Sequence, residues 1–138
     1  MTTVTRKIHF AVKGHRKRAI AGPAPDAAKP AGRVPRIARL MALAIRFERL
    51  LDEGVVANQT ELARLAHVTQ PRMTQIMNLL HLAPDIQEEI LFLPEVVEGR
   101  DRVTERDVRG IVAMPQWEHQ RARFRELLKH NNLVIPSP

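Results

Sequence analysis

A run of polar side chains, Gln70, Arg72, Thr74 and Gln75, lies within six consecutive residues. Their hydrogen-bonding groups match base edges in the major groove of DNA: arginine pairs with guanine O6 and N7, glutamine with adenine N6 and N7, and threonine with several bases. No acidic residue occurs from Thr69 to Leu82, whereas an ordinary solvated helix face usually includes glutamate. We therefore expect these four side chains to read bases.

A second group of residues carries amides, hydroxyls or positive charges suited to phosphate. Two of them stand where helices are expected to begin, and the free backbone N–H groups of a helix N-terminus also bind anions. We expect phosphate contacts from Asn58, Gln59, Thr60, Arg64, Thr69 and Asn78, and from Arg16, Lys17 and Arg18 nearer the N-terminus.

The segment from Gln59 to Met77, QTELARLAHVTQPRMTQIM, predicts the elements that position these side chains: a helix, a short turn and a second helix. Ala63 must be small, because two helices joined by so short a turn cross closely. This pattern is a helix-turn-helix. Small helical domains also contain such pairs that touch no nucleic acid, so the polar run is what favours DNA. The apolar residues that should lock the pair together are Leu62, Ala63, Ala66, Val68, Met73, Ile76 and Met77.

The ends of both helices carry capping signals. Asn58 and Thr69 can accept hydrogen bonds from free N–H groups, and Glu61, three residues after Asn58, suits a capping box. Pro71 lies in the first turn of the second helix, where its missing donor costs nothing. His67 stands in the turn, where a positive φ is expected, and histidine enters that region more readily than most residues.

Positive charge is concentrated near the N-terminus. The formal net charge is +7, but residues 1–39 alone carry ten Lys or Arg against Asp26, a charge of +9. A cationic segment beside a DNA-reading module is the usual footprint of phosphate binding, with counterion release adding affinity. A solubilising or RNA-binding tail is the alternative, because polybasic segments bind any polyanion.

The N-terminal region predicts one strand and a linker. Apolar and polar residues alternate over residues 3–13, and no second strand pattern is visible, so the strand is expected to pair with another copy or with another protein. Residues 14–36 are rich in Pro, Ala and Gly and predict a flexible or extended basic linker.

The rest of the chain has helical periodicity. We predict an all-α, multi-helix domain over residues 34–132, preceded by the basic arm 1–33 and followed by a tail, 133–138. Its other helices are expected from about residue 35 to a stop at Gly54, over residues 84–93, after a Thr104 cap with Asp107, and from Pro115.

The last of these helices has two interpretations. Its stripe, which includes Trp117, Phe124, Leu127 and Leu128, is expected to pack onto the domain core. The alternative is dimerisation through the same stripe, since Arg121, Arg123 and Arg125 leave an opposite, solvated face.

The sequence lacks the residues that several classes of enzyme and metal site require. There is no cysteine and no tyrosine, Ser137 is the only serine, and the six histidines form no metalloprotease motif. Carboxylate pairs such as Asp52-Glu53 and Glu88-Glu89 suit solvated helix surfaces. We expect no enzyme activity, no metal and no cofactor. Charges interrupt the apolar run from Ile37 to Leu51, and no secretion signal is visible, so we expect a cytoplasmic, nucleoid-associated protein without a membrane span.

The segment from Leu79 to Leu93, LLHLAPDIQEEILFL, resembles the stretch after the helix-turn-helix in the ParB and KorB partition family, whose pattern is roughly LLxLPxxVQxxL. Residues 104–109, TERDVR, resemble a later helix of the same domain. The resemblance covers about residues 58–112. It implies an all-helical DNA-binding domain that reads a short site through the helix starting at Thr69.

The departures from the family limit what the resemblance implies. The family's upstream nucleotide-binding domain and its arginine-rich GERR-type motif are not found here, so nucleotide-dependent clamping is not expected. The chain also resembles small helix-turn-helix proteins that accompany phage or mobile-element recombinases.

Two hypotheses follow. The first is a sequence-specific protein that binds double-stranded DNA as a homodimer, as a transcriptional regulator or a partition-like accessory of a phage, plasmid or other mobile element. The second is an architectural adaptor that joins a partner such as a recombinase through the N-terminal strand and binds DNA weakly through its basic arm.

Overall fold

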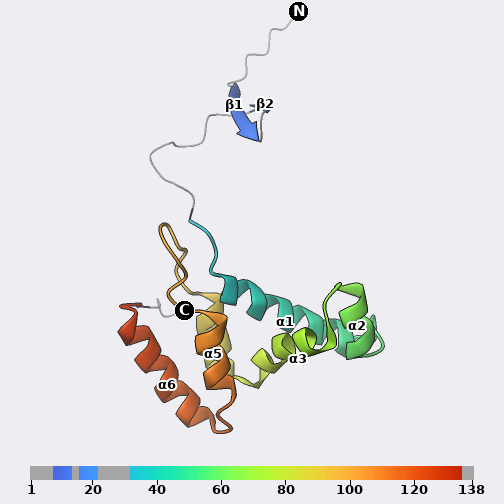
Figure 1. The fold of residues 1–138 in the computed structure, drawn as a ribbon, viewed down its shortest axis with the longest axis vertical. Helices are drawn as coiled ribbons and strands as arrows, with labels where there is room; N and C mark the ends of the chain where they lie inside the picture. The colour runs from blue at the N-terminus through green and yellow to red at the C-terminus, as the bar shows by residue number, and fades with distance from the viewer. Residues whose placement is uncertain (1–7, 14–15, 22–31, 135–138) are drawn as a thin grey trace, which may run out of the picture. The chain divides into compact units, whose positions relative to one another are not determined.

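The computed structural model describes residues 8–13, 16–21 and 32–134, which fall into two compact units, residues 1–31 and 32–138. The first unit contains a β-hairpin, and the second contains six α-helices and one 3-10 turn among its described residues. Figure 1 labels the elements along the chain. The described part of the protein is therefore mostly helical, as the periodicity predicts.

The hairpin corrects the expectation of a strand without a partner in its own chain. β1 (Ile8–Lys13) pairs antiparallel with β2 (Arg16–Ala21), with Phe10 opposite Ala19 and Lys13 opposite Arg16. β2 lies in the segment predicted as linker. Its sequence, RKRAIA, begins with three cations and shows no apolar alternation, so the pattern alone gave no strand signal there. Residues 3–7 of the predicted strand lie outside the described residues.

α1 (Arg36–Asp52) is the central support of the helical unit. Ile37, Met41 and Ala44 are fully buried at helical spacing, and Phe47 continues the same face. The helix packs against α3 (Gln70–Asn78), α4 (Pro84–Leu91) and the 3-10 turn η1 (Leu79–His81). Gly54, with a φ of 71°, follows the helix closely, as predicted for the residue that ends it.

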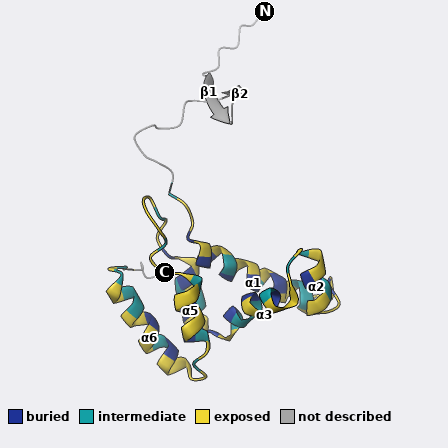
Figure 2. Cartoon of the chain, viewed as in Figure 1, coloured by how far each residue is buried: buried dark blue, intermediate teal, exposed yellow. Residues whose placement is uncertain are grey.

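The other described helices of this unit are α2 (Gln59–Leu65), α5 (Glu105–Val112) and α6 (Trp117–His130). In Figure 1, α2 lies at one end of the helical unit and α6 at the other, with α5 beside α6. In Figure 2 the buried positions on these helices are turned toward the inside of the unit.

The borders of the helical unit differ from those predicted. Arg33 belongs to this unit, because its backbone N–H and C=O pair with those of Val96 at 3.0 and 2.8 Å and its side chain contacts Asp101. At the other end Leu133 packs against the core, so it is not part of a tail. Residues 135–138 of the predicted tail lie outside the described residues.

The two aromatic residues in the apolar stripe of α6 differ in how far they are buried. Phe124 is 1% exposed and lies in the core, as predicted. Trp117 is 49% exposed, and the Arg121 guanidinium lies 6.0 Å from its ring centroid. α6 also begins at Trp117, two residues later than the predicted start at Pro115.

Candidate functional site

The candidate site is the outward side of α3, and the packing of α2 and α3 positions it. Ala63 is 2% exposed, so the methyl group is enclosed where a larger side chain would not fit. Met73 and Ile76, on the inward side of α3, are 1% and 4% exposed. This inward packing leaves the opposite side of α3 facing solvent.

The connection between the two helices adopts the expected conformation. His67 has a φ of 56°, in the left-handed region. The Val68 N–H then donates to the Ala63 carbonyl at 3.1 Å, which closes the end of α2. The prediction of a positive φ at His67 is confirmed.

At the start of both helices, the side-chain oxygen of the predicted cap accepts a hydrogen bond from the backbone. Asn58 Oδ1 accepts from the Glu61 N–H at 2.9 Å, and Thr69 Oγ1 accepts from the Arg72 N–H at 3.3 Å. The Glu61 carboxylate accepts from the Ala57 N–H at 3.2 Å, one residue before the position that a capping box requires. Asn58 and Thr69 therefore stabilise the helix starts with the oxygens that were expected to face phosphate.

Three of the four expected base-reading side chains, Gln70, Thr74 and Gln75, are exposed on α3. The Thr74 hydroxyl donates to the Gln70 carbonyl at 3.1 Å, which is an ordinary contact within a helix. Among the expected phosphate contacts near α3, Gln59, Thr60 and Arg64 are exposed and Asn78 is half-buried. The expected contacts Arg16, Lys17 and Arg18 belong to β2, in the other unit.

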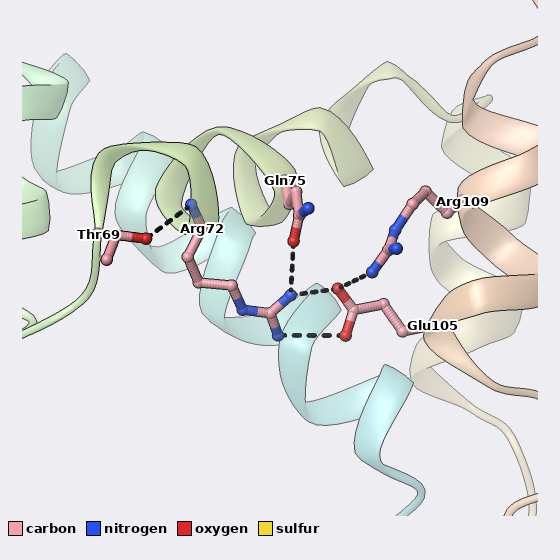
Figure 3. Close-up of polar contacts among 5 residues, drawn as sticks. All are labelled: Thr69, Arg72, Gln75, Glu105 and Arg109. Atoms are coloured by element: carbon pink, nitrogen blue, oxygen red, sulfur yellow. Dashed lines mark hydrogen bonds and ion pairs between the residues drawn. The ribbon is translucent and has the colours of Figure 1, made fainter.

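Arg72 is the one expected base-reading side chain that is partly buried. Its side chain is 26% exposed and forms an ion pair with Glu105 of α5 that uses both carboxylate oxygens, with Nη2 to Oε2 at 3.1 Å. Its Nη1 also donates to Gln75 Oε1 at 3.1 Å (Figure 3). Arg72 was expected to read bases, but in the structure its guanidinium contacts Glu105 and connects α3 to α5.

The ion pair has clear electrostatic consequences. Hydrogen bonds from Arg72 hold the pKa of Glu105 below its ordinary value, against the effect of burial, and those to Glu105 raise the pKa of Arg72. Arg109, four residues after Glu105 on α5, adds a further contact to the same carboxylate at 3.3 Å. At neutral pH the carboxylate is therefore ionised and shared by two arginines.

Glu105 and Arg109 were not among the expected site residues. Glu105 is 33 residues from Arg72 in the chain, and only the packing of α5 against η1, the turn that follows α3, brings it into contact. A groove of about 360 Å³ between these elements is lined by Gln75, Asn78, Leu79, His81, Glu105, Arg109, Val112 and Ala113. The available sequence signal was limited to the Thr104 cap, which fixes Glu105 at the first position of α5.

Other kinds of site find no support in the part of the chain that the structure describes. No group of three or more His, Asp or Glu side chains there is arranged to hold a metal ion. Among the same residues, no helix combines the length and apolar character needed to cross a membrane.

Comparison with known proteins adds no family assignment. No family model, no curated protein and no solved structure matches this chain.

Proposed function

We propose that this protein binds double-stranded DNA at a specific sequence, with α2 and α3 acting as a helix-turn-helix and α3 lying in the major groove. The observation that carries the proposal is the outward side of α3, where Gln70, Thr74 and Gln75 are all exposed and the helix itself carries no acidic residue. B-DNA admits a helix into its major groove, where amide and hydroxyl groups distinguish the base pairs.

The rigidity of the α2–α3 pair supports this use. α3 is fixed by burial of Met73 and Ile76, by the Thr69 cap and by the contact of Arg72 with Glu105. A reading surface must hold its side chains in place, because each hydrogen bond to a base requires a defined geometry. The base-reading set is now Gln70, Thr74 and Gln75, with Arg72 as a support for the helix.

Phosphate contacts are proposed from α2 and, separately, from the N-terminal unit. Gln59, Thr60 and Arg64 are exposed on α2, the helix that would cross the DNA backbone in this arrangement. The N-terminal unit, residues 1–31, adds seven Lys or Arg against one acidic residue, whereas residues 32–134 carry fifteen against fourteen. Non-specific attraction to DNA is therefore assigned to the N-terminal unit.

The biological role is proposed from the likeness of residues 58–112 to the ParB and KorB partition family. A regulator or a partition-like accessory of a mobile element fits a small DNA-reading domain. One reading helix covers only a few base pairs, so we propose that two copies bind an inverted repeat. The formation of a hairpin within one chain removes the reason to assign this pairing to β1.

Selection of binding sites from a random DNA pool tests the proposal. The parent protein should enrich one motif, expected to be an inverted repeat, whereas an adaptor with weak DNA binding should enrich none. Replacing both Gln70 and Gln75 with Ala should abolish enrichment. Gln116→Ala is the matched control, because Gln116 is exposed and its side chain makes no cap hydrogen bond at α6. Failure of the parent protein to enrich any motif would contradict the proposal.

A further inference from the structure

Contacts around Gln75 bear on which base this residue reads. We propose that Arg72 and Glu105 are positioning residues that fix the Gln75 amide with its oxygen turned inward, so that Gln75 selects a base that presents acceptors and no donor in the major groove. The proposal rests on the proposed DNA-reading function of α3.

The orientation of the amide follows from the chemistry of its partner. Arg72 Nη1 lies 3.1 Å from the Gln75 side chain, and a guanidinium has donors but no acceptor. The amide atom facing Arg72 must therefore be Oε1, whichever way the amide is first drawn. Figure 3 shows Oε1 directed at the guanidinium and Nε2 on the other branch of the amide.

The guanidinium is itself held in place. Both oxygens of Glu105 accept from Arg72, and the side chains of the two partners are only 18% and 26% exposed. Two parallel hydrogen bonds between an arginine and a carboxylate fix the plane of the guanidinium as well as its position. Arg72 is thus anchored on α5 while it donates to Gln75.

The fixed amide changes the base that Gln75 is expected to recognise. A glutamine that reads adenine uses Oε1 to accept from N6 and Nε2 to donate to N7. Here Oε1 is turned to Arg72, and Gln75 Nε2 donates no hydrogen bond within residues 32–134. Nε2 matches guanine, which presents O6 and N7, and secondly thymine, which presents O4, because neither base places a donor in the major groove.

The experiment first locates the base pair that Gln75 reads. Motifs selected by the parent protein and by Gln75→Ala are compared, and the position whose preference disappears in the variant is assigned to Gln75. The parent should prefer guanine or thymine there by about tenfold over adenine, the discrimination expected of a well-oriented contact.

A second variant tests whether Arg72 sets this preference. Arg72→Met removes the donor, frees the amide to turn and should reduce the preference over adenine to about twofold or less, on the same scale of base discrimination. Affinities for paired sites that differ only at this position give the ratio. Arg123→Met is the matched control, because Arg123 also forms an ion pair, with Glu126, but lies on α6. Circular dichroism checks that each variant is folded.

If Arg72→Met does not fold, a third variant, Gln75→Glu, tests whether Arg72 orients the side chain at position 75. In Gln75→Glu one carboxylate oxygen can take the contact with Arg72, which leaves the other oxygen outward as an acceptor. The preference should then move to cytosine or adenine, which present amino donors.

Each outcome bears on one of the two proposals. The positioning proposal is overturned by adenine or cytosine at the Gln75 position in the parent, by an unchanged ratio in folded Arg72→Met, by a Gln75→Glu variant that keeps guanine, or by a Gln75→Ala variant that alters no position. A parent protein that selects no motif contradicts the DNA-reading function itself.

Discussion

At the scale of single residues, the turn between α2 and α3 depends on the backbone of His67. A φ of 56° costs an L-residue free energy, since its Cβ approaches the neighbouring carbonyl. Glycine has no Cβ and adopts this conformation freely, although it loses more entropy on folding. His67 therefore stores a small amount of strain at a position next to the proposed reading helix.

His67→Gly is expected to raise the free energy of unfolding by about 0.5 to 1 kcal/mol, the relieved strain less the added entropy cost. Urea denaturation followed by circular dichroism measures the change. Gly54→Ala is the complementary control: its φ is 71° and an added Cβ would meet no atom within 4 Å, so backbone strain and chain entropy change but packing does not. That variant should lose about 1 kcal/mol. A destabilised His67→Gly would show that the imidazole makes a contribution larger than the strain.

The Arg72–Glu105 pair predicts a dependence of stability on pH. The pKa of Glu105 is lower in the folded protein than its ordinary value, so the pair stabilises fully above the ordinary glutamate pKa, about 4.3, and this contribution is lost as the pH falls toward the folded pKa. Glu105→Gln should therefore cost about 1 to 2 kcal/mol near pH ~7 and clearly less near pH ~3.

Urea denaturation of parent and variant at both pH values measures this difference. The comparison must be made between the two proteins, because hydrogen bonds from Arg121 also lower the pKa of Asp85 and make both proteins lose stability in acid. An equal difference at the two pH values would show that the charge of Glu105 contributes nothing.

At the scale of elements, α2 and α3 are held together by a close approach at Ala63. Ala63→Leu should lower the free energy of unfolding by about 1 to 3 kcal/mol, because the added atoms have no space between the helices. Ala122→Leu makes the same change at an exposed position of α6 and should have almost no effect. Thermal unfolding compares the two variants, and similar melting temperatures would contradict close packing at Ala63.

A buried polar residue also connects elements that are distant in the chain. Gln120 of α6 is 1% exposed; its Oε1 accepts from the Ala83 N–H at 2.9 Å and its Nε2 donates to the Met114 carbonyl at 2.9 Å. These bonds tie α6 to the segment between η1 and α4 and to the loop before α6. Both polar atoms of the Gln120 amide have hydrogen-bond partners, so its burial leaves no unpaired polar group and carries only a small free-energy cost.

At the scale of the whole molecule, charge is divided between the two units. Deleting residues 1–31 removes seven cations and leaves the helical unit, which includes Arg33, complete. Affinity should fall on every DNA sequence, and the slope of log K against log salt should flatten by about 0.9 for each lost phosphate contact. The selected motif should stay the same. Gel shifts at several salt concentrations measure the slope, and an unchanged slope would show that the N-terminal unit does not contact DNA.

The sequence by itself determined the helical elements and several of their caps. Apolar spacing predicted α1 and the inward faces of α2 and α3, and local signals predicted the caps at Asn58, Thr69 and Thr104 and the backbone of His67. These features depend on residues a few positions apart, and the side chains and backbone groups involved are neighbours in the chain.

Only the tertiary structure decided which polar residues remain free. Arg72 is followed by no acidic residue nearby, so the sequence indicated an exposed cation, but α5 brings Glu105 to it. Trp117 resembles a core residue by its spacing, yet the buried face of α6 begins only at Gln120 and leaves the indole half-exposed. The pairing of β1 with β2 was likewise hidden, because three cations begin β2. In each case the deciding contact joins residues whose proximity depends on how whole elements pack or pair, and periodicity within one segment carries no information about that.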